Sequence, residues 1–281
     1  MSHLEELHKA MLDMLVDIDR VCRKNNIAYF LSAGTLLGAV RHQGFIPWDD
    51  DADIMMPRKD YDRFLSIAAN ELGPYYFVQY HDTEPYYRHT FAKIRRNGTA
   101  CIIQDHRHIR MHQGIFVDVF PLENVYCSNT SRKLFWWIGA VTDKLCALSV
   151  ARLPEKYRWL SSLKWIVELC FKPSFFSRVS NSLIRAIQPE ESSHLLCVMG
   201  STKLRPLPIS WIGKGRDAPF GGRLLRVPDN PESYLQCLYG DFMRFPPVDQ
   251  RMPAHAKDGT QVSVSEDYRA FIPELYGDRV E

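Results

Sequence analysis

Two stretches of the chain repeat apolar residues at intervals of three and four, which is the period of one helical face. The first runs from residue 2 to 24, with Ser2 as its expected N-cap and the asparagine pair 25–26 at its end. The second begins at Pro57 and stops at residues 73–74, Gly-Pro, where a helix cannot continue. Both stretches are therefore predicted to be helices.

Strands are predicted where short apolar runs lie between turn residues. A short strand is expected over residues 27–31, followed by a turn of small residues over 32–35 and a short helix over 35–41. Another strand is expected over residues 90–94, with residues 101–104 as its hairpin partner. These elements mix helices and strands, which predicts an α+β fold.

Residues 114–121 form a strongly apolar predicted strand that contains one carboxylate, Asp118. On a strand, Val117 and Val119 face one way and Asp118 faces the other. A carboxylate is costly to bury unless a partner neutralises it, so Asp118 is a candidate functional residue. The alternative is a solvent-facing position at the edge of a sheet.

Residues 131–188 differ in character from the rest of the chain. They hold four of the six tryptophans, and basic residues outnumber acidic ones. Helices of this composition are typical of a surface that lies on an anionic membrane, and they equally fit helices that pack their aromatic side chains inwards. We divide the chain into a core over residues 1–130, a helical insertion over 131–200, and a C-terminal segment over 201–281 that packs back on the core.

Composition narrows the possible function classes. The 281 residues are 46% hydrophobic and 24% charged, as in ordinary soluble proteins, and the net charge of +2 argues against a nucleic-acid binder. Seven cysteines, none in a C-x-x-C pattern, predict reduced core residues in a cytoplasmic protein. The polar N-terminus is unlike a signal peptide, and no apolar run is long enough to span a bilayer.

The acidic run at residues 49–53 is the strongest candidate site. If it forms a strand, Asp49, Asp51 and Asp53 share one face, and Asp50 lies on the other. Carboxylates this close repel one another unless a cation lies between them, and oxygen ligands suit Mg²⁺ or Mn²⁺. The alternative is a solvated acidic turn, but Pro-Trp before the run and Ile-Met-Met after it favour a buried site.

The turn that contains Gly34 and Thr35 precedes a predicted helix. Such a turn exposes backbone N–H groups, and the helix adds the positive end of its dipole, which is a geometry that binds phosphate. A phosphate site, a nearby metal site and the isolated Asp118 together predict chemistry on a metal-bound phosphate ester. This ordered combination resembles the nucleotidyltransferase superfamily, in which two carboxylates on one strand and a third on its neighbour hold a divalent metal.

A closer resemblance covers most of the chain outside the insertion. The run from Ser32 to Asp53 (SAGTLLGAVRHQGFIPWDDDAD) resembles the signature of the LicD family. Further similar segments are Lys-Ile-Arg at residues 93–95, residues 114–123, and Tyr-Gly-Asp at residues 239–241 with the prolines after it. The resemblance implies a nucleotidyltransferase-type mixed sheet flanked by helices. It also implies a bacterial enzyme that transfers phosphocholine from a CDP-linked donor to a surface glycan, such as lipopolysaccharide or teichoic acid, and releases CMP.

The same resemblance implies roles for individual residues. Asp51, Asp53 and Asp118 would bind Mg²⁺ or Mn²⁺ and form the catalytic set, and Asp118 is also the candidate acceptor of the hydroxyl proton. Substrate contacts would come from the remaining candidates: Gly34 and Thr35 on donor phosphate, Arg41 and Lys93 on residual negative charge, His42 as a turn or supporting residue, and Asp49 as a metal ligand or as the group that orients Arg41.

The expected partners are a CDP-alcohol and a glycan acceptor, free or lipid-linked, with no nucleic acid. Residues 131–188 would place the protein at the inner face of the membrane if they bind lipid. A rival enzyme would make the CDP-alcohol from CTP and release pyrophosphate. A rival from another class is a non-catalytic protein that binds nucleotide or glycan, which would have no need of the full set of three carboxylates.

Overall fold

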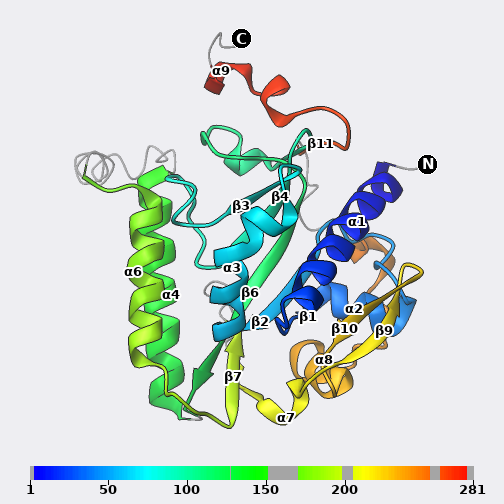
Figure 1. Cartoon of the computed structure of the whole chain (residues 1–281), viewed down its shortest axis with the longest axis vertical. Helices are drawn as coiled ribbons and strands as arrows, with labels where there is room; N and C mark the ends of the chain where they lie inside the picture. Colours follow the sequence, from blue (N-terminus) through cyan, green and yellow to red (C-terminus); the bar gives the residue numbers. More distant parts are fainter. Residues whose placement is uncertain (1–2, 127, 151–169, 198–204, 254–259, 277–281) are drawn as a thin grey trace.

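A computed structural model of the chain describes residues 3–126, 128–150, 170–197, 205–253 and 260–276 (Figure 1). The N-cap predicted at Ser2, the tryptophans Trp159 and Trp165, and Cys127 lie outside the described residues.

A mixed sheet organises the fold around one long strand, β6 (Phe116–Val125). Strand β2 (Asp53–Pro57) runs parallel to β6 along one edge, while β4 (Ala92–Arg96) and β7 (His194–Cys197) run antiparallel to it along the other edge. The outer positions belong to β1 (Phe30–Leu31), β3 (Tyr76–Gln79) and β8 (Leu207–Pro208). The mixed sheet with flanking helices confirms the predicted α+β class.

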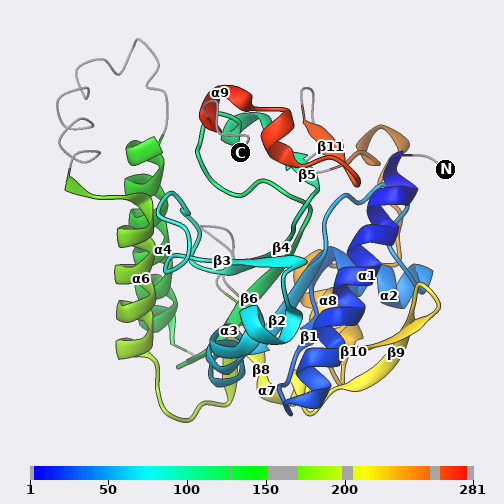
Figure 2. The same ribbon diagram turned by 45° about the horizontal axis from the view of Figure 1, so that its top comes forward.

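Helices α1 (His3–Lys24) and α3 (Arg58–Leu72) pack together and against the sheet (Figure 2). Their apolar faces are fully buried, for example at Ile18 and Phe64. The ends of both helices agree with the predictions, because Pro57 precedes α3 and Gly73 follows it in a left-handed conformation (φ 75°) that favours glycine.

The C-terminal part of the chain packs beside the start of the sheet. The hairpin β9 (Arg216–Phe220) and β10 (Arg223–Val227) contacts α1 and β1, and α8 (Pro231–Tyr239) contacts α2 (Ala33–His42). Shorter elements complete the described chain: β5 (Ala100–Ile102), η1 (Gln104–His106), α7 (Ile209–Ile212), η3 (Val248–Gln250), β11 (Gln261–Ser263), η4 (Tyr268–Ala270) and α9 (Pro273–Tyr276).

Helices α4 (Asn129–Val150) and α6 (Pro173–Ile187) lie side by side at one edge of the molecule (Figures 1 and 2). Residues 129–150 and 173–187 are helical, whereas residues 194–197, also within the predicted insertion, form strand β7 of the main sheet. Among the described helices, none combines the length and apolar composition that crossing a bilayer requires.

Three local predictions were wrong. The acidic run is not a strand, since β2 starts only at Asp53. Strand β5 pairs with β11, from the far end of the chain, rather than with β4. Helix α2 begins at Ala33, so Gly34 and Thr35 belong to its first turn instead of a separate turn before it.

Candidate active site

Three neighbouring strands bring Asp53, Asp118 and Lys93 into one row. Asp53 on β2 is the register partner of Asp118 on β6, and Asp118 is the register partner of Lys93 on β4. Paired positions on adjacent strands direct their side chains to the same face of a sheet. All three residues are buried. The sheet therefore joins two predicted metal ligands and the predicted phosphate-binding lysine, although they are up to 65 residues apart in sequence.

Lys93 neutralises one of these carboxylates directly. Its Nζ lies 2.5 Å from Asp118 Oδ1, and the ammonium also sits over the Phe116 ring, 3.7 Å from the centroid. Burial lowers the pKa of Lys93, and the charge of Asp118 opposes that shift. Lys93 is therefore the neutralising partner that Asp118, an isolated carboxylate in an apolar strand, was expected to need.

The surroundings of Asp53 disfavour its charged form. Its pKa is raised well above the ordinary aspartate value, first by burial and then by the negative charges of Asp51, Asp118 and Asp49. The positive charge of Lys93 offsets only part of this effect. Asp53 therefore lies within electrostatic reach of all the acids that were predicted to surround a cation.

The acids before β2 form a tight cluster. One carboxylate oxygen from each of Asp49, Asp50 and Asp51 lies within 4.8 Å of the other two. The prediction that Asp50 faces away from Asp49 and Asp51 was wrong, because these residues precede the strand and do not follow its two-residue period. Asp50, itself buried, is thus a candidate ligand that the sequence reasoning missed.

Backbone contacts hold this acidic segment in place. His8 on α1 contacts the Asp49 carbonyl with its Nε2 at 2.6 Å. The Asp118 amide donates to the Ala52 carbonyl at 2.8 Å, which connects the segment to β6. The acidic segment is therefore anchored through main-chain hydrogen bonds on both sides.

The first turn of α2 lies against two of the acidic residues, Asp49 and Asp53. The Thr35 hydroxyl is buried and accepts a hydrogen bond from the Asp53 amide at 2.8 Å. A Cβ at Gly34 would come within 2.7 Å of Asp49 Oδ2, so only glycine allows this close approach. Both residues thus contact the predicted metal ligands, and the Thr35 hydroxyl helps to position Asp53.

A cavity of about 660 Å³ lies between α2 and the segment that follows α8. Its lining is aromatic and basic and includes Arg41, Trp48, Phe245 and Arg251. The Arg41 guanidinium sits 4.5 Å from the Phe245 ring centroid, and that of Arg251 lies 5.4 Å from the ring centroids of both Trp48 and Phe245. Cations stacked on aromatic rings are well suited to a ligand that has a flat base and negative charge.

His42 contacts two residues that line this cavity, Trp48 and Phe245, through its ring. Arg41 Nε donates to His42 Nε2 at 3.0 Å, and Arg41 also donates to the Phe242 carbonyl at 3.1 Å. Burial, followed by the charge of Arg41, lowers the pKa of His42, so its ring stays neutral and can accept this bond. His42 and Phe242 therefore orient Arg41, a task for which Asp49 was one candidate.

Tyr239 links the cavity to the acids. It lines the cavity, and its pKa is raised by burial and then by the charges of Asp53, Asp49 and Asp51. Sequence reasoning placed neither Tyr239 nor Phe245 nor Arg251 in the site. The available signal was the Tyr-Gly-Asp segment at residues 239–241, which resembles the LicD family and directly precedes the lining residues.

The donor set fits a hard divalent cation. It consists of carboxylate oxygens, several of them buried, and mutual repulsion already disfavours the charged form of Asp53. A divalent ion would relieve this repulsion and suits such ligands. The candidate ligands are Asp49, Asp50 and Asp51, whose oxygens converge, with Asp53 and Asp118 adjacent on the sheet.

Clustered carboxylates, a buried lysine and a basic aromatic cavity define a candidate active site for a phosphate-containing ligand. Residues 26–144 match the family described as LicD/FKTN/FKRP, nucleotidyltransferase domain. The chain is also 26% identical over 266 residues to the lipopolysaccharide cholinephosphotransferase LicD of Haemophilus influenzae, covering 91% of this chain and 97% of that protein.

Shorter matches extend to two rickettsial proteins. An uncharacterized protein of Rickettsia typhi is 47% identical over 58 residues, and one of Rickettsia prowazekii is 49% identical over 51 residues. These matches cover about a fifth of each protein, 19% in both cases. The chain is therefore similar to the LicD family over residues 26–144 and to one lipopolysaccharide cholinephosphotransferase over most of its length.

Proposed function

We propose that this protein transfers a phosphocholine-like group from a CDP-linked donor to a hydroxyl of a cell-surface glycan precursor and releases CMP. The match of residues 26–144 to the LicD family and the similarity to a lipopolysaccharide cholinephosphotransferase support the reaction class. The observation that carries the proposal is the row of Asp53, Asp118 and Lys93 beside the acidic cluster.

In this reaction the acceptor hydroxyl oxygen attacks the phosphorus that bears the choline-like group. A new P–O bond forms, the bond from that phosphorus to CMP breaks, and CMP leaves with the electron pair. Asp118 accepts the hydroxyl proton, while Lys93 holds the Asp118 carboxylate in position at 2.5 Å. Asp118 is therefore the catalytic base in this proposal, and Lys93 is the residue that positions it and offsets negative phosphate charge.

The acids supply the site for Mg²⁺ or Mn²⁺. Asp51, Asp53 and Asp118, assisted by Asp49 and Asp50, would hold the ion, which neutralises charge on the donor diphosphate. Thr35 keeps Asp53 in register through its hydrogen bond to the Asp53 amide. Gly34 leaves room for the Asp49 carboxylate.

The cavity next to the acids would bind the nucleotide. Trp48 and Phe245 offer rings for stacking with a pyrimidine base, and Arg41 and Arg251 offer charge for phosphate. Tyr239 joins this cavity to the carboxylates, so one donor can reach both regions. The sugar acceptor would approach the same acids from the open side.

The decisive experiment compares two sets of substrates. Wild-type protein is incubated with CDP-choline and a lipopolysaccharide acceptor, and separately with CTP and phosphocholine, each with and without Mg²⁺. CMP release with choline incorporated into the glycan, only when Mg²⁺ is present, is the expected result. Pyrophosphate release from CTP would instead establish a cytidylyltransferase. Nucleotide binding without either product would establish a binding protein.

Single substitutions test the roles proposed for Asp53 and Asp118. Asp53→Asn and Asp118→Asn should each abolish transfer, while circular dichroism shows an intact fold. Asp13→Asn, at an acid on α1 outside the site, is the matched control and should turn over like wild type. Wild-type turnover in Asp53→Asn or Asp118→Asn would contradict the proposed roles.

A further inference from the structure

Helix α6 has its polar and apolar faces reversed relative to a helix that packs on a soluble core. Its buried positions are mainly small or polar: Pro173, Ser174, Ser177, Ser180, Asn181 and Ile184. Its exposed positions include Phe175, Val179 and Leu183, each with at least 40% of its surface in solvent. These three recur at intervals of four, which puts them on one face of the helix.

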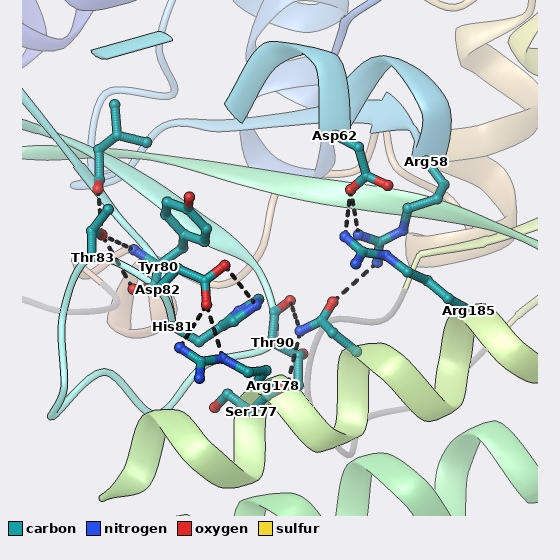
Figure 3. Close-up of polar contacts among 12 residues, drawn as sticks. Arg58, Asp62, Tyr80, His81, Asp82, Thr83, Thr90, Ser177, Arg178 and Arg185 are labelled. Carbon is teal, nitrogen blue, oxygen red and sulfur yellow. Dashed lines mark hydrogen bonds and ion pairs between the residues drawn. The ribbon is translucent and has the colours of Figure 1, made fainter. Parts of the chain in front are cut away.

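Polar contacts from exposed arginines and from one buried asparagine attach α6 to the rest of the molecule (Figure 3). Arg178 pairs with Asp82 and Arg185 pairs with Asp62, both at 2.7 Å. Asn181 donates to the Thr90 carbonyl at 3.0 Å. The helix is therefore held firmly in its orientation, and the outward direction of its apolar face is fixed by these contacts.

Burying the polar face has a cost in water. The Ser180 hydroxyl is buried and has no hydrogen-bond partner among the described residues. An unpaired buried polar group and a row of exposed apolar side chains are both unfavourable for a helix surrounded by water. The exposed apolar side chains would be stabilised where the outer face meets an apolar medium.

Helix α4 extends this surface. It packs against α6 through an apolar cluster that includes Phe135 and Ile184, and through small residues, with Cys146 Sγ 3.5 Å from the Pro173 carbonyl oxygen and 3.8 Å from Ser177 Oγ. On the outside it exposes Leu134, Trp137 and Val141, which follow a helical spacing of three and four.

Aromatic and basic residues border this apolar surface. Trp136 and Trp137 are in edge-to-face contact on α4, while Phe171 and Phe175 stack at the start of α6. The exposed lysines on the two helices and at their border are Lys133, Lys144 and Lys172. Within α4 and α6 as described, Asp143 is the one acidic residue.

We infer that the outer face of α4 and α6 binds the surface of an anionic lipid bilayer. Exposed apolar side chains, exposed aromatic rings and exposed lysines on the same two helices match the apolar interior, the interface and the charged headgroups of such a bilayer. A protein partner would match the apolar area, but it would not require the aromatic rings and the lysines together. This inference concerns a different surface from the proposed active site and does not depend on it.

The test is flotation of the full-length protein with lipid vesicles. Vesicles of phosphatidylcholine alone are compared with vesicles that contain about 30% phosphatidylglycerol, at low and high salt. We expect binding to the anionic vesicles at low salt and a marked decrease at high salt. The double variant Val179→Glu with Leu183→Glu should reduce binding by about tenfold or more, because it puts two charges on the apolar face.

Matched controls separate this surface from general charge and hydrophobicity. Tyr75→Glu with Leu224→Glu adds the same charge at exposed apolar positions elsewhere and should bind like wild type. Lys133→Gln with Lys144→Gln should weaken binding to anionic vesicles. Lys59→Gln with Lys214→Gln removes the same charge from other exposed positions and should have little effect.

Three results would overturn the inference. They are failure of the wild-type protein to bind anionic vesicles at low salt, equal binding by the Val179→Glu/Leu183→Glu variant, and a dimer in sedimentation velocity that this variant dissociates. The last result would assign the face to a second copy of the chain. Transfer to a lipid-free acceptor, measured on the same variant, should remain at the wild-type level, so failure of the proposed reaction can be told apart from failure of lipid binding.

Discussion

The ion pair between Lys93 and Asp118 lies inside the sheet, and Lys93→Met tests how much the fold depends on it. Methionine keeps most of the side-chain volume over the Phe116 ring but removes the charge. Asp118 would then be a buried carboxylate without its cation, next to Asp53, whose charged form is already disfavoured by its neighbours. Removing one partner of a buried pair typically costs about 3–5 kcal/mol.

The cost should depend on pH in a defined direction. The pKa of Asp53 is already raised by burial and by the neighbouring acids, and removing the charge of Lys93, which opposes this shift, raises it further. Carboxylates of this kind destabilise the fold as the pH rises through their folded pKa, and the loss disappears below the unfolded value of about 4. We therefore expect the destabilisation to be largest at neutral pH and to shrink as the pH falls.

Urea unfolding followed by circular dichroism, in buffer with EDTA, measures this effect. A double-mutant cycle with Asp118→Asn should give a coupling energy of about 1–3 kcal/mol, because the double variant no longer leaves an unpaired charge. Lys59→Met, at an exposed position, should change stability by less than about 0.5 kcal/mol. Two results would contradict this reasoning: a cost of less than about 1 kcal/mol for Lys93→Met, or single-variant effects that simply add. Either would mean that Lys93 does not stabilise the fold by neutralising Asp118.

Further predictions concern the acids, the start of α2 and the cavity. Asp53→Asn should stabilise the metal-free protein at neutral pH and lose this gain as the pH falls, because the wild-type pKa is raised; equal stability at pH 7 in thermal unfolding would contradict this. Thr35→Val should cost about 1–3 kcal/mol, measured by urea unfolding, since it leaves the Asp53 amide without its acceptor. Gly38→Ala should lower the free energy of unfolding by about 1–3 kcal/mol or more, since its Cβ would lie 2.4 Å from the Gly44 carbonyl oxygen. Unchanged stability would mean that the backbone around Gly44 can move away at little cost. Arg251→Gln should raise the KM for the CDP-linked donor more than it lowers kcat, and a pure loss of kcat would place Arg251 at the reacting atoms instead.

Helix ends and the central apolar strand were predictable because their signals are local. Pro57 and Gly73 mark the limits of α3 in the sequence itself, and the apolar run around Asp118 identifies β6 without knowledge of its neighbours. Such features depend on a few successive residues, so pattern and period are sufficient.

Other features depend on contacts between distant segments. Asp50 joins the acid cluster because main-chain bonds from His8 and Asp118 fix the segment before β2, and no local pattern encodes those bonds. Strand β5 finds its partner about 160 residues away in β11, where hairpin reasoning selects the nearest strand. The division into residues 1–130, 131–200 and 201–281 stays a prediction.

The hydroxyl of Tyr234 on α8 lies 2.9 Å from Ser32 Oγ, at the very start of α2. This contact joins α8 to the start of α2, whose Thr35 hydroxyl bonds to the Asp53 amide. Residues 26–144, although recognisable by themselves, include neither Tyr234 nor the Phe245 wall of the cavity. A truncated protein limited to that range would carry the carboxylates without the complete pocket, so a lack of activity in it would not test the reaction proposed for the full chain.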